Sequence, residues 1–278
     1  MRAAVLGKPI EHSLSPVIHN AGYTAAGLHD WTYGRHECDE PALARFVDSL
    51  DETWAGLSLT MPLKEVALAV ADEATPVAEA IGAANTLVLR GGRRVADNTD
   101  APGIVDALAD IGVKEANEVA VLGAGGSARG ALAAAKRLGA YTVTVYARRR
   151  EAVAELEPVA ERLGVRLKAK GWDEAGFAGR ADLVIATVPK GVTDDLRPVW
   201  GADTVLFDIL YDPWPTPLAA AAEREGVRVI DGLALLLAQA ARQWTQFTGL
   251  DEAPVAAMRK ALYQAVPSRT VPPESSQP

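Results

Sequence analysis

The sequence has 278 residues, of which 49% are hydrophobic and 23% charged, which is typical of a folded globular protein and excludes a disordered chain. This length allows two domains, each with a core of its own. A formal net charge of −8 argues against a surface that binds nucleic acid, although it does not exclude local basic pockets for small anions.

The cysteine content and the apolar runs indicate where the protein resides. Cys38 is the single cysteine, so no internal disulfide can form and a reducing compartment is favoured. The apolar run after Met1 is too short for a signal peptide, and the stretch from Gly232 is too short to cross a bilayer. We therefore expect a cytoplasmic monomer or homodimer without a membrane partner. No cluster of His, Cys and Asp indicates a metal site.

The first hundred residues alternate strands and helices, which predicts an α/β fold with a mostly parallel sheet and helices on its faces. A hairpin is expected over 85–97, turning at Gly91–Gly92. The other predicted strands are 2–7, 31–38 and 54–62, and the predicted helices are 16–28, 40–50 and 63–72.

A different pattern begins after residue 100 with a helix that bridges two domains. Residues 118–150 then have the pattern of strand, glycine turn, helix and second strand. The remaining predicted strands are 181–189, 204–210 and 227–230, and the remaining predicted helices are 217–226, 233–249 and 253–266.

The sequence VAVLGAGGSARG has the features of a dinucleotide-binding turn. Gly123 and Gly125 follow an apolar strand directly and precede a helix, and this context makes a glycine pattern informative. Gly123 permits the tight turn, Gly125 lets the backbone approach a pyrophosphate, and Ala128 is the small residue where helix and strand pack. A glycine-rich connection without a ligand is the alternative, and the complete strand–turn–helix–strand context favours the cofactor.

The end of the second strand indicates which dinucleotide binds. An NAD site normally carries a carboxylate there, about twenty residues after the glycines, to bind the ribose 2′-hydroxyl. This chain instead has Ala147 followed by Arg148, Arg149 and Arg150. Guanidinium groups suit a 2′-phosphate, so NADP is favoured over NAD. The alternative is a solvated charge run at a helix start, in which Glu151 pairs with one arginine.

Polar residues in the first hundred positions suggest chemistry. Lys64 is expected in the first turn of a helix, where the dipole disfavours its ammonium form. Asn85 and Asp100 stand in loops near the predicted domain boundary, where turn formation or helix capping is a sufficient explanation for each alone.

Two serines precede Pro16 at the start of the first predicted helix. One hydroxyl is enough to cap a helix, so either Ser13 or Ser15 is available for another role. Both hydroxyls together could donate to an anion at the positive end of the helix.

Seven motifs occur in the order found in the shikimate dehydrogenase family, which the chain resembles from its first strand to about Gly249. The motifs are GKPIEHSLSPVIHN, LTMPLK, GAANTL, DNTD, GAGGSARG, YDPWPTPL and DGLALLLAQAA. The resemblance implies a substrate-binding α/β domain and a Rossmann-type NADP-binding domain. It also implies C-terminal helices that pack back on the first domain, followed by a mobile tail. These four parts are expected over 1–100, 101–232, 233–265 and 266–278.

The resemblance further implies the NADPH-dependent, reversible reduction of 3-dehydroshikimate to shikimate, a step in the biosynthesis of aromatic amino acids. It makes Lys64 and Asp100 the catalytic pair, in which Lys64 gives a proton, or at least a positive field, to the ketone oxygen. Ser13 and Ser15 are then the ligands of the substrate carboxylate. The other implied substrate contacts are Thr60, Asn85, Tyr211 and Gln239. The implied cofactor contacts are Gly123, Ala124, Gly125, Gly126, Ser127, Ala128, Ala147, Arg148, Arg149, Thr187, Gly232 and Leu235.

Three positions depart from the family pattern. Ser58 replaces a common asparagine, IATVPKG lacks an asparagine before Thr187, and Leu235 replaces a methionine. The first two departures leave it undecided which polar contacts these positions make with substrate and cofactor. The third departure exchanges one apolar side chain for another of similar size.

Two alternative functions remain. An NAD-dependent quinate/shikimate dehydrogenase would tend to carry an acidic residue near the ribose, where this chain has Arg148, and a threonine where it has Ser15. A non-catalytic NADP-binding regulator would not require both Lys64 and Asp100.

Overall fold

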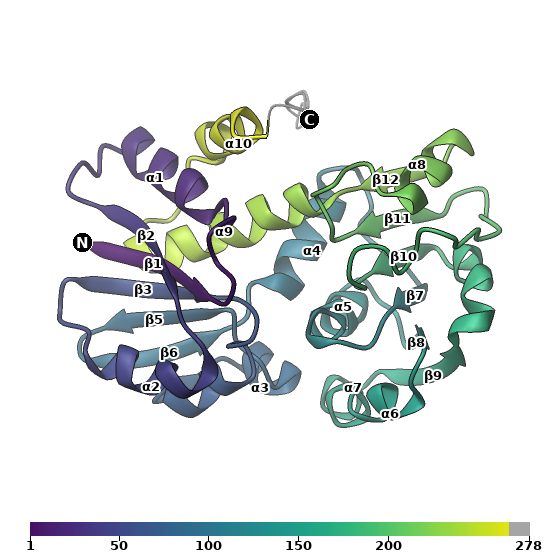
Figure 1. The fold of residues 1–278 in the computed structure, drawn as a ribbon, viewed down its shortest axis with the longest axis horizontal. Helices are drawn as coiled ribbons and strands as arrows, with labels where there is room; N and C mark the ends of the chain where they lie inside the picture. The colour runs from purple at the N-terminus through teal and green to yellow at the C-terminus, as the bar shows by residue number, and fades with distance from the viewer. Residues whose placement is uncertain (267–278) are drawn as a thin grey trace. The chain divides into compact units, whose positions relative to one another are not determined.

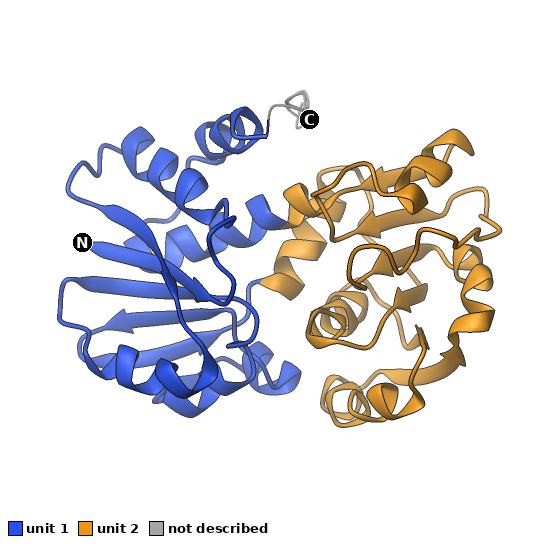
Figure 2. Cartoon of the chain, in the orientation of Figure 1, with its two compact units in different colours: residues 1–99, 236–278 blue, residues 100–235 orange. Residues whose placement is uncertain are grey.

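The structure is a computed structural model that describes residues 1–266. The chain forms two compact units (Figure 2): unit 1 comprises residues 1–99 and the described chain from Leu236 onward, and unit 2 comprises residues 100–235. The tail predicted over 266–278 lies, apart from Val266, outside the described residues. No helix within residues 1–266 has the length and apolarity needed to cross a membrane.

Unit 1 is built on a six-stranded mixed sheet (Figure 1) with the order β2-β1-β3-β5-β6-β4. β1 pairs in parallel with β2 and β3, whereas β5 is antiparallel to both of its neighbours. The strands are β1 (Arg2–Gly7), β2 (Thr32–Glu37), β3 (Trp54–Leu59), β4 (Glu73–Ala74), β5 (Thr86–Arg90) and β6 (Arg93–Asp97). The predicted hairpin is confirmed: β5 and β6 join through Gly91 and Gly92, whose φ angles of 59° and 74° favour glycine.

Helices cover both faces of this sheet. The first face packs on α2 (Glu40–Asp48), η1 (Val66–Val70) and α3 (Pro76–Ile81) around Leu6, Leu57 and Leu87. The second face packs on α1 (Ser15–Ala25) and α9 (Gly232–Thr248), and α10 (Val255–Gln264) packs on α1. The C-terminal helices therefore return to the sheet formed by the N-terminal residues.

Two glycines, Gly22 and Gly56, allow close packing on the second face of the sheet. A Cβ atom on Gly22 would lie 2.7 Å from Trp244 Nε1 and 3.2 Å from Met258 Cγ, so α1 approaches both α9 and α10 there. A Cβ on Gly56 would overlap the Phe247 ring. These glycines let α9 and α10 lie close to α1 and β3.

Two short elements of unit 1 differ from the prediction. The helix expected over 63–72 is wrong: residues 61–65 form a turn, and only a five-residue 3₁₀ helix, η1, follows. Val66 and Val70 are β-branched and therefore weak helix formers. The sequence analysis also missed α3, although the Thr75 hydroxyl caps it by accepting the N–H of Ala78 at 3.3 Å.

The start of α1 also differs from the expected serine cap. Ser15 is the first helical residue and Leu14 occupies the capping position, without a side-chain cap. The Ser13 hydroxyl accepts the N–H of Ser15 at a long 3.4 Å. The Ser15 hydroxyl does not cap the helix, because Ser15 lies inside it.

His19 lies on the buried face of α1. Its ring is fully buried and stacks on Tyr33 with 4.0 Å between ring centroids. Burial lowers the pKa of His19 from 6.5 to about 3, and a weaker interaction with Gln243 offsets part of that shift. Neither ring nitrogen has a hydrogen bond of normal geometry, so the neutral ring acts as a packing residue.

We expect His19 to make unit 1 acid-sensitive. Between pH 6.5 and about 3 the unfolded chain protonates this histidine while the folded chain does not, so stability falls as the pH falls. In this window His19 contributes a slope of up to about 1.4 kcal/mol per pH unit to the free energy of unfolding. Denaturant titrations of His19→Phe at several pH values should show a shallower slope than wild type. The exposed-site control His29→Phe should keep the wild-type slope, and equal slopes in all three proteins would contradict the assignment.

Unit 2 contains a fully parallel six-stranded sheet with the order β12-β11-β10-β7-β8-β9. The strands are β7 (Glu118–Leu122), β8 (Thr142–Ala147), β9 (Arg166–Gly171), β10 (Leu183–Ala186), β11 (Val205–Asp208) and β12 (Arg228–Ile230). This is the doubly wound order in which the chain reverses direction across the sheet between β7 and β10. The predicted Rossmann-type architecture is confirmed.

Both faces of this sheet are covered by apolar cores. One core involves α4 (Asp100–Ala109), α5 (Gly126–Arg137), α6 (Arg150–Ala154) and α7 (Glu157–Leu163). The other involves η2 (Trp172–Arg180) and α8 (Pro217–Arg224). The sequence analysis missed β9, because this edge strand is exposed along most of its length and lacks the apolar pattern of a buried strand.

Candidate functional site

One edge of the unit 1 sheet gathers most of the predicted substrate residues. β1 and β3 are parallel and both end at this edge, since Leu6 pairs with Leu59 (Figure 1). The antiparallel β5 begins at the same edge, since its Thr86 pairs with Ser58 of β3. β6 also ends there, because Asp97 pairs with Thr86. The loops at this edge carry Ser13, Ser15, Thr60, Lys64, Asn85 and Thr99.

Backbone hydrogen bonds fix the turn that carries Thr60 and Lys64. The N–H of Thr60 donates to Leu6 O at 2.9 Å, and the carbonyl of Lys64 accepts the N–H of Ala84 at 2.7 Å. The Lys64 side chain is half-buried. Because Lys64 precedes η1 and lies in a turn, the helix-dipole argument made from the sequence does not apply to it.

Asn85 is a buried residue at the start of β5. Its Oδ1 accepts the N–H of Thr99 at 2.8 Å, and its Nδ2 donates to Thr99 Oγ1 at 2.9 Å. Asn98 donates to Ala83 O at 3.0 Å, as a turn-forming side chain does. These bonds fix the segment that leads directly into Asp100, the first residue of α4.

The remaining predicted substrate residues lie on other elements. Gln239, on α9, is 9% exposed and donates to Leu236 O at 2.9 Å. Tyr211 follows β11 in unit 2, where burial raises the pKa of its hydroxyl and the charge of Asp212 adds to the shift. Asp100 also belongs to unit 2, so the structure groups six of the eight residues within unit 1.

The glycine turn after β7 has the backbone that a dinucleotide site needs. Gly123 has a φ of 102°, and a Cβ there would lie 2.8 Å from Val188 Cγ1, so no other residue fits well. The Thr187 hydroxyl donates to Leu122 O at 2.9 Å and joins the ends of β10 and β7. This is the point of strand-order reversal, where such sheets bind ligands.

The next residues leave open space for a phosphate. Cβ atoms on Gly125 or Gly126 would meet no protein atom within 4 Å, and α5 begins at Gly126 with N–H groups that lack partners in the helix. Ser127 is half-buried, Ala124 is partly buried and Ala128 is fully buried in the core. The residues therefore fit a pyrophosphate at the start of α5.

We expect Gly125→Ala to weaken NADP binding without destabilising the fold. Its φ of −91° suits alanine and the added methyl group meets no protein atom, so the thermal midpoint should not change. A pyrophosphate against this backbone would clash with the methyl group and raise the NADP Kd roughly tenfold, about 1.4 kcal/mol. Isothermal titration calorimetry and thermal unfolding provide the two readouts. Gly34→Ala, at another open glycine, is the control, and unchanged NADP affinity in Gly125→Ala would contradict the site.

The end of β8 carries exposed cations. Ala147 is the buried last residue of the strand, and Arg148, Arg149 and Arg150 that follow are exposed. Within residues 1–266 no carboxylate, Glu151 included, forms an ion pair with any of the three arginines. The alternative in which Glu151 neutralises this run is therefore not observed.

The start of α9 supplies the last predicted cofactor residues. The Asp231 carboxylate caps this helix by accepting the N–H of Ala234 at 3.1 Å. Gly232 abuts the main chain of β11, because a Cβ there would overlap the carbonyl group of Ile209. Leu235 is partly buried against the core of unit 2.

The structure adds a buried polar group that the sequence analysis did not single out. Gln243 is 1% exposed and its carboxamide bonds to Ser58 and Thr86, while Tyr33 also bonds to Ser58. Gln243 lies four residues after Gln239 on an apolar helix, so both project from one face. That spacing is the signal that could have revealed it.

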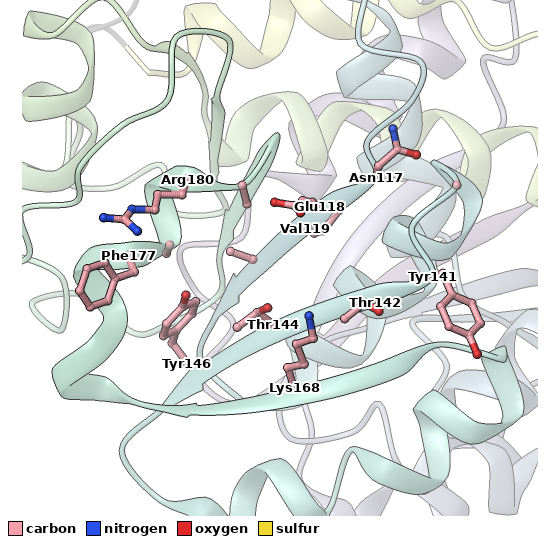
Figure 3. A pocket seen from close by; sticks show the side chains of 14 residues that line it. Asn117, Glu118, Val119, Tyr141, Thr142, Thr144, Tyr146, Lys168, Phe177 and Arg180 are labelled. Carbon is pink, nitrogen blue, oxygen red and sulfur yellow. The ribbon is translucent and has the colours of Figure 1, made fainter.

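A cavity of about 480 Å³ lies elsewhere in unit 2 (Figure 3). Its lining includes Glu118 at the start of β7, whereas the glycine turn follows the other end of that strand. Thr142 and Thr144 of β8 and Lys168 of β9 line the sheet side of the cavity. Such a polar lining suits a solvated sheet face, and we assign no ligand to it.

Comparisons with known proteins agree with these features. The profile of the "Shikimate dehydrogenase substrate binding domain" matches residues 5–87, and that of the "Shikimate 5'-dehydrogenase C-terminal domain" matches residues 232–263. The NADP-dependent shikimate dehydrogenase of Desulfitobacterium hafniense is 36% identical over 95% of this chain and 97% of its own length. The shikimate dehydrogenase structure from Mycobacterium tuberculosis has a TM-score of 0.87 at 44% identity, covering 94% of this chain and 98% of the other. The Thermus thermophilus shikimate 5-dehydrogenase, solved with NADP(H) and shikimate, has a TM-score of 0.83 at 31% identity, covering 95% and 99%.

Proposed function

Because the chain belongs to the shikimate dehydrogenase family, we propose that it catalyses the reversible, NADPH-dependent reduction of 3-dehydroshikimate to shikimate. The observation that carries this proposal is the match to NADP-dependent relatives over nearly the whole chain. The loops at the edge of the unit 1 sheet and the glycine turn of unit 2 support it. The reaction belongs to the biosynthesis of aromatic amino acids.

On the substrate side, Ser13 and Ser15 bind the carboxylate of the ring acid. The Ser13 hydroxyl accepts only a long bond from Ser15 N–H, and its own O–H is then free to donate to an anion at the start of α1. Thr60, Asn85 and Gln239 hydrogen-bond the ring hydroxyls. Tyr211, in unit 2, is a further proposed contact of the substrate.

Lys64 and Asp100 perform the proton chemistry. Reduction places negative charge on the ketone oxygen, and the Lys64 ammonium donates a proton to it. Asp100 accepts a hydrogen bond from the hydroxyl that forms. In the direction of oxidation Lys64, as the neutral amine, takes the hydroxyl proton, so the same atom Nζ serves both directions.

The residues of unit 2 fit NADP. The backbone from Gly123 to Ala128 cradles the pyrophosphate, and Arg148, with Arg149 second, binds the 2′-phosphate. Gly232 and Leu235 would lie near the nicotinamide, and Thr187 and Ala147 would be further contacts of the cofactor. When bound, the reduced nicotinamide supplies the hydride for the ketone carbon.

An assay of nicotinamide absorbance tests the proposal. Purified protein with NADP should show reduction when shikimate is added, little with quinate, and none without either. Preference for NAD with quinate would make the protein a quinate/shikimate dehydrogenase. Tight NADP binding without turnover of either acid would make it a regulator, and both outcomes would contradict the proposal. We further propose that the protein acts in the cytoplasm as a monomer or homodimer, in keeping with its single cysteine and acidic charge.

A further inference from the structure

A row of polar side chains lies buried between the sheet of unit 1 and α9. Tyr33 comes from β2, Ser58 from β3, Thr86 from β5 and Gln243 from α9, and each is 4% exposed or less. Burying such groups without partners costs about 1–3 kcal/mol each, so their hydrogen bonds decide whether the row is stable.

The hydrogen bonds of this row run in one direction. The Tyr33 hydroxyl donates to Ser58 Oγ at 2.6 Å, and the Ser58 hydroxyl donates to Gln243 Oε1 at 2.7 Å. Gln243 Nε2 donates to Thr86 Oγ1 at 3.0 Å, and the Thr86 hydroxyl donates to Asn85 Oδ1 at 2.8 Å. Bonds aligned in this way polarise one another and strengthen the chain.

Gln243 has no donor left for a ligand. Its second N–H donates to the carbonyl oxygen of Asn85 at 3.0 Å, so both N–H groups are used inside the protein. The amide cannot be reversed, because its oxygen would then face the carbonyl oxygen of Asn85, which has no proton to give. The row therefore fixes the carboxamide of Gln243 in one orientation.

The row ends at one proposed ligand of shikimate, Asn85. At one end, Asn85 Oδ1 accepts from the Thr86 hydroxyl and the Thr99 N–H, which fixes the amide with Nδ2 on the donor side, where it bonds to Thr99 Oγ1. At the other end, the Tyr33 hydroxyl gives its single proton to Ser58, and the Tyr33 ring stacks on the buried His19.

We propose that Gln243 is a positioning residue: without touching the substrate, its carboxamide holds Asn85 in its donor orientation through Thr86. The inference rests on the proposed function, because it takes Asn85 as a ligand of shikimate. It predicts that changes at Gln243 act on shikimate binding and leave NADP binding alone, since the proposed phosphate-binding residues of NADP belong to unit 2.

The first test compares two replacements of similar size. Gln243→Met leaves Ser58 and Thr86 without their partner and should raise the KM for shikimate roughly tenfold to a hundredfold, with a smaller loss of kcat. The NADP Kd should stay within about twofold of wild type. Gln246→Met is the matched control on the same helix. Gln246 donates to Asp97 at 2.6 Å, so the control also loses a helix–sheet bond, but it should keep the wild-type KM.

The second test uses a variant whose hydrogen bonding depends on pH. A neutral carboxylic acid in Gln243→Glu can accept from Ser58 and donate one bond to Thr86, whereas the ionised acid has no donor. At each pH, the KM of Gln243→Glu for shikimate is divided by the wild-type KM. This ratio should be close to one at acidic pH, and it should rise toward the ratio of Gln243→Met as the acid ionises. Ionisation of a buried acid beside His19 also lowers the stability of unit 1, so the thermal midpoint is measured at each pH and the KM is compared only where Gln243→Glu is folded.

The outcomes separate the inference from the proposed function. If wild type does not turn over shikimate, the proposed function fails and the inference fails with it. If wild type is active and Gln243→Met keeps its KM, or Gln246→Met loses as much, or Gln243→Glu is insensitive to pH, the inference alone fails. Should Gln243→Met not fold, Ser58→Ala provides the test, with an expected severalfold rise in the same KM and no change in the NADP Kd.

Discussion

Lys64→Ala is expected to lower kcat for shikimate oxidation by roughly 10²–10⁴-fold, the usual contribution of a positioned acid or base. The backbone at this residue is held by the bond from Ala84 N–H at 2.7 Å, which does not involve the side chain, so the turn should survive the substitution. KM should change by much less than kcat, because the lost interaction forms mainly in the transition state. Steady-state kinetics with saturating NADP provide the measurement.

A second variant at this position separates two roles of the ammonium group. Lys64→Arg keeps the positive charge, but a guanidinium stays protonated and cannot serve as the base in oxidation. We therefore expect Lys64→Arg to be nearly as slow as Lys64→Ala. Restored turnover in Lys64→Arg would mean that the positive field suffices. Lys8→Ala, at a half-exposed lysine that pairs with Asp39, is the control, and wild-type kcat in Lys64→Ala would refute the catalytic assignment.

Arg148→Glu is expected to lower kcat/KM for NADP roughly a hundredfold or more while leaving that for NAD nearly unchanged. The guanidinium has no carboxylate partner within residues 1–266, so the substitution breaks no ion pair of the protein. Loss of a charged hydrogen bond to the 2′-phosphate costs about 1.5–3 kcal/mol, and repulsion from the new carboxylate adds to it. A carboxylate there also suits the ribose hydroxyl of NAD.

The arginine run supplies its own control for this prediction. Arg150→Glu makes the same change of charge two residues later, at the first position of α6. Arg150→Glu should lower kcat/KM for NADP only slightly, because its negative charge acts on the phosphate only through a screened, longer-range repulsion. An equal loss in Arg150→Glu would mean that the three arginines act as a diffuse patch, and a larger loss in Arg149→Glu would move the phosphate site to that residue.

Features set by local backbone chemistry could be predicted from the sequence. Gly91, Gly92 and Gly123 adopt positive φ angles, and their turns were located from composition alone. Apart from β9, the strands of unit 2 are largely buried apolar runs, and their pattern identified them. The residues proposed for the site came from motif order, and their grouping at the edge of the unit 1 sheet follows from the register of β1, β3 and β5.

Features set by distant contacts could not be predicted in this way. The turn around Lys64 is held by Ala84, twenty residues away, against a local pattern that favoured a helix. Ser58 and Gln243 lie 185 residues apart, and no periodicity reports their hydrogen bond. β9 has the polar composition of a surface loop, yet it pairs with β8 along its whole length. In each case the tertiary partner overrides the local preference.

The division of unit 1 along the chain has a consequence during translation. When a ribosome has completed the first 99 residues, every strand of the first sheet exists, but of the helices on its second face only α1 does. Trp244 and Phe247 emerge about 150 residues later, a delay on the order of 10–30 s at ordinary elongation rates. Unit 2 is continuous in sequence and can finish folding within this interval. The nascent N-terminal segment therefore waits with part of one apolar face uncovered, where a chaperone could bind.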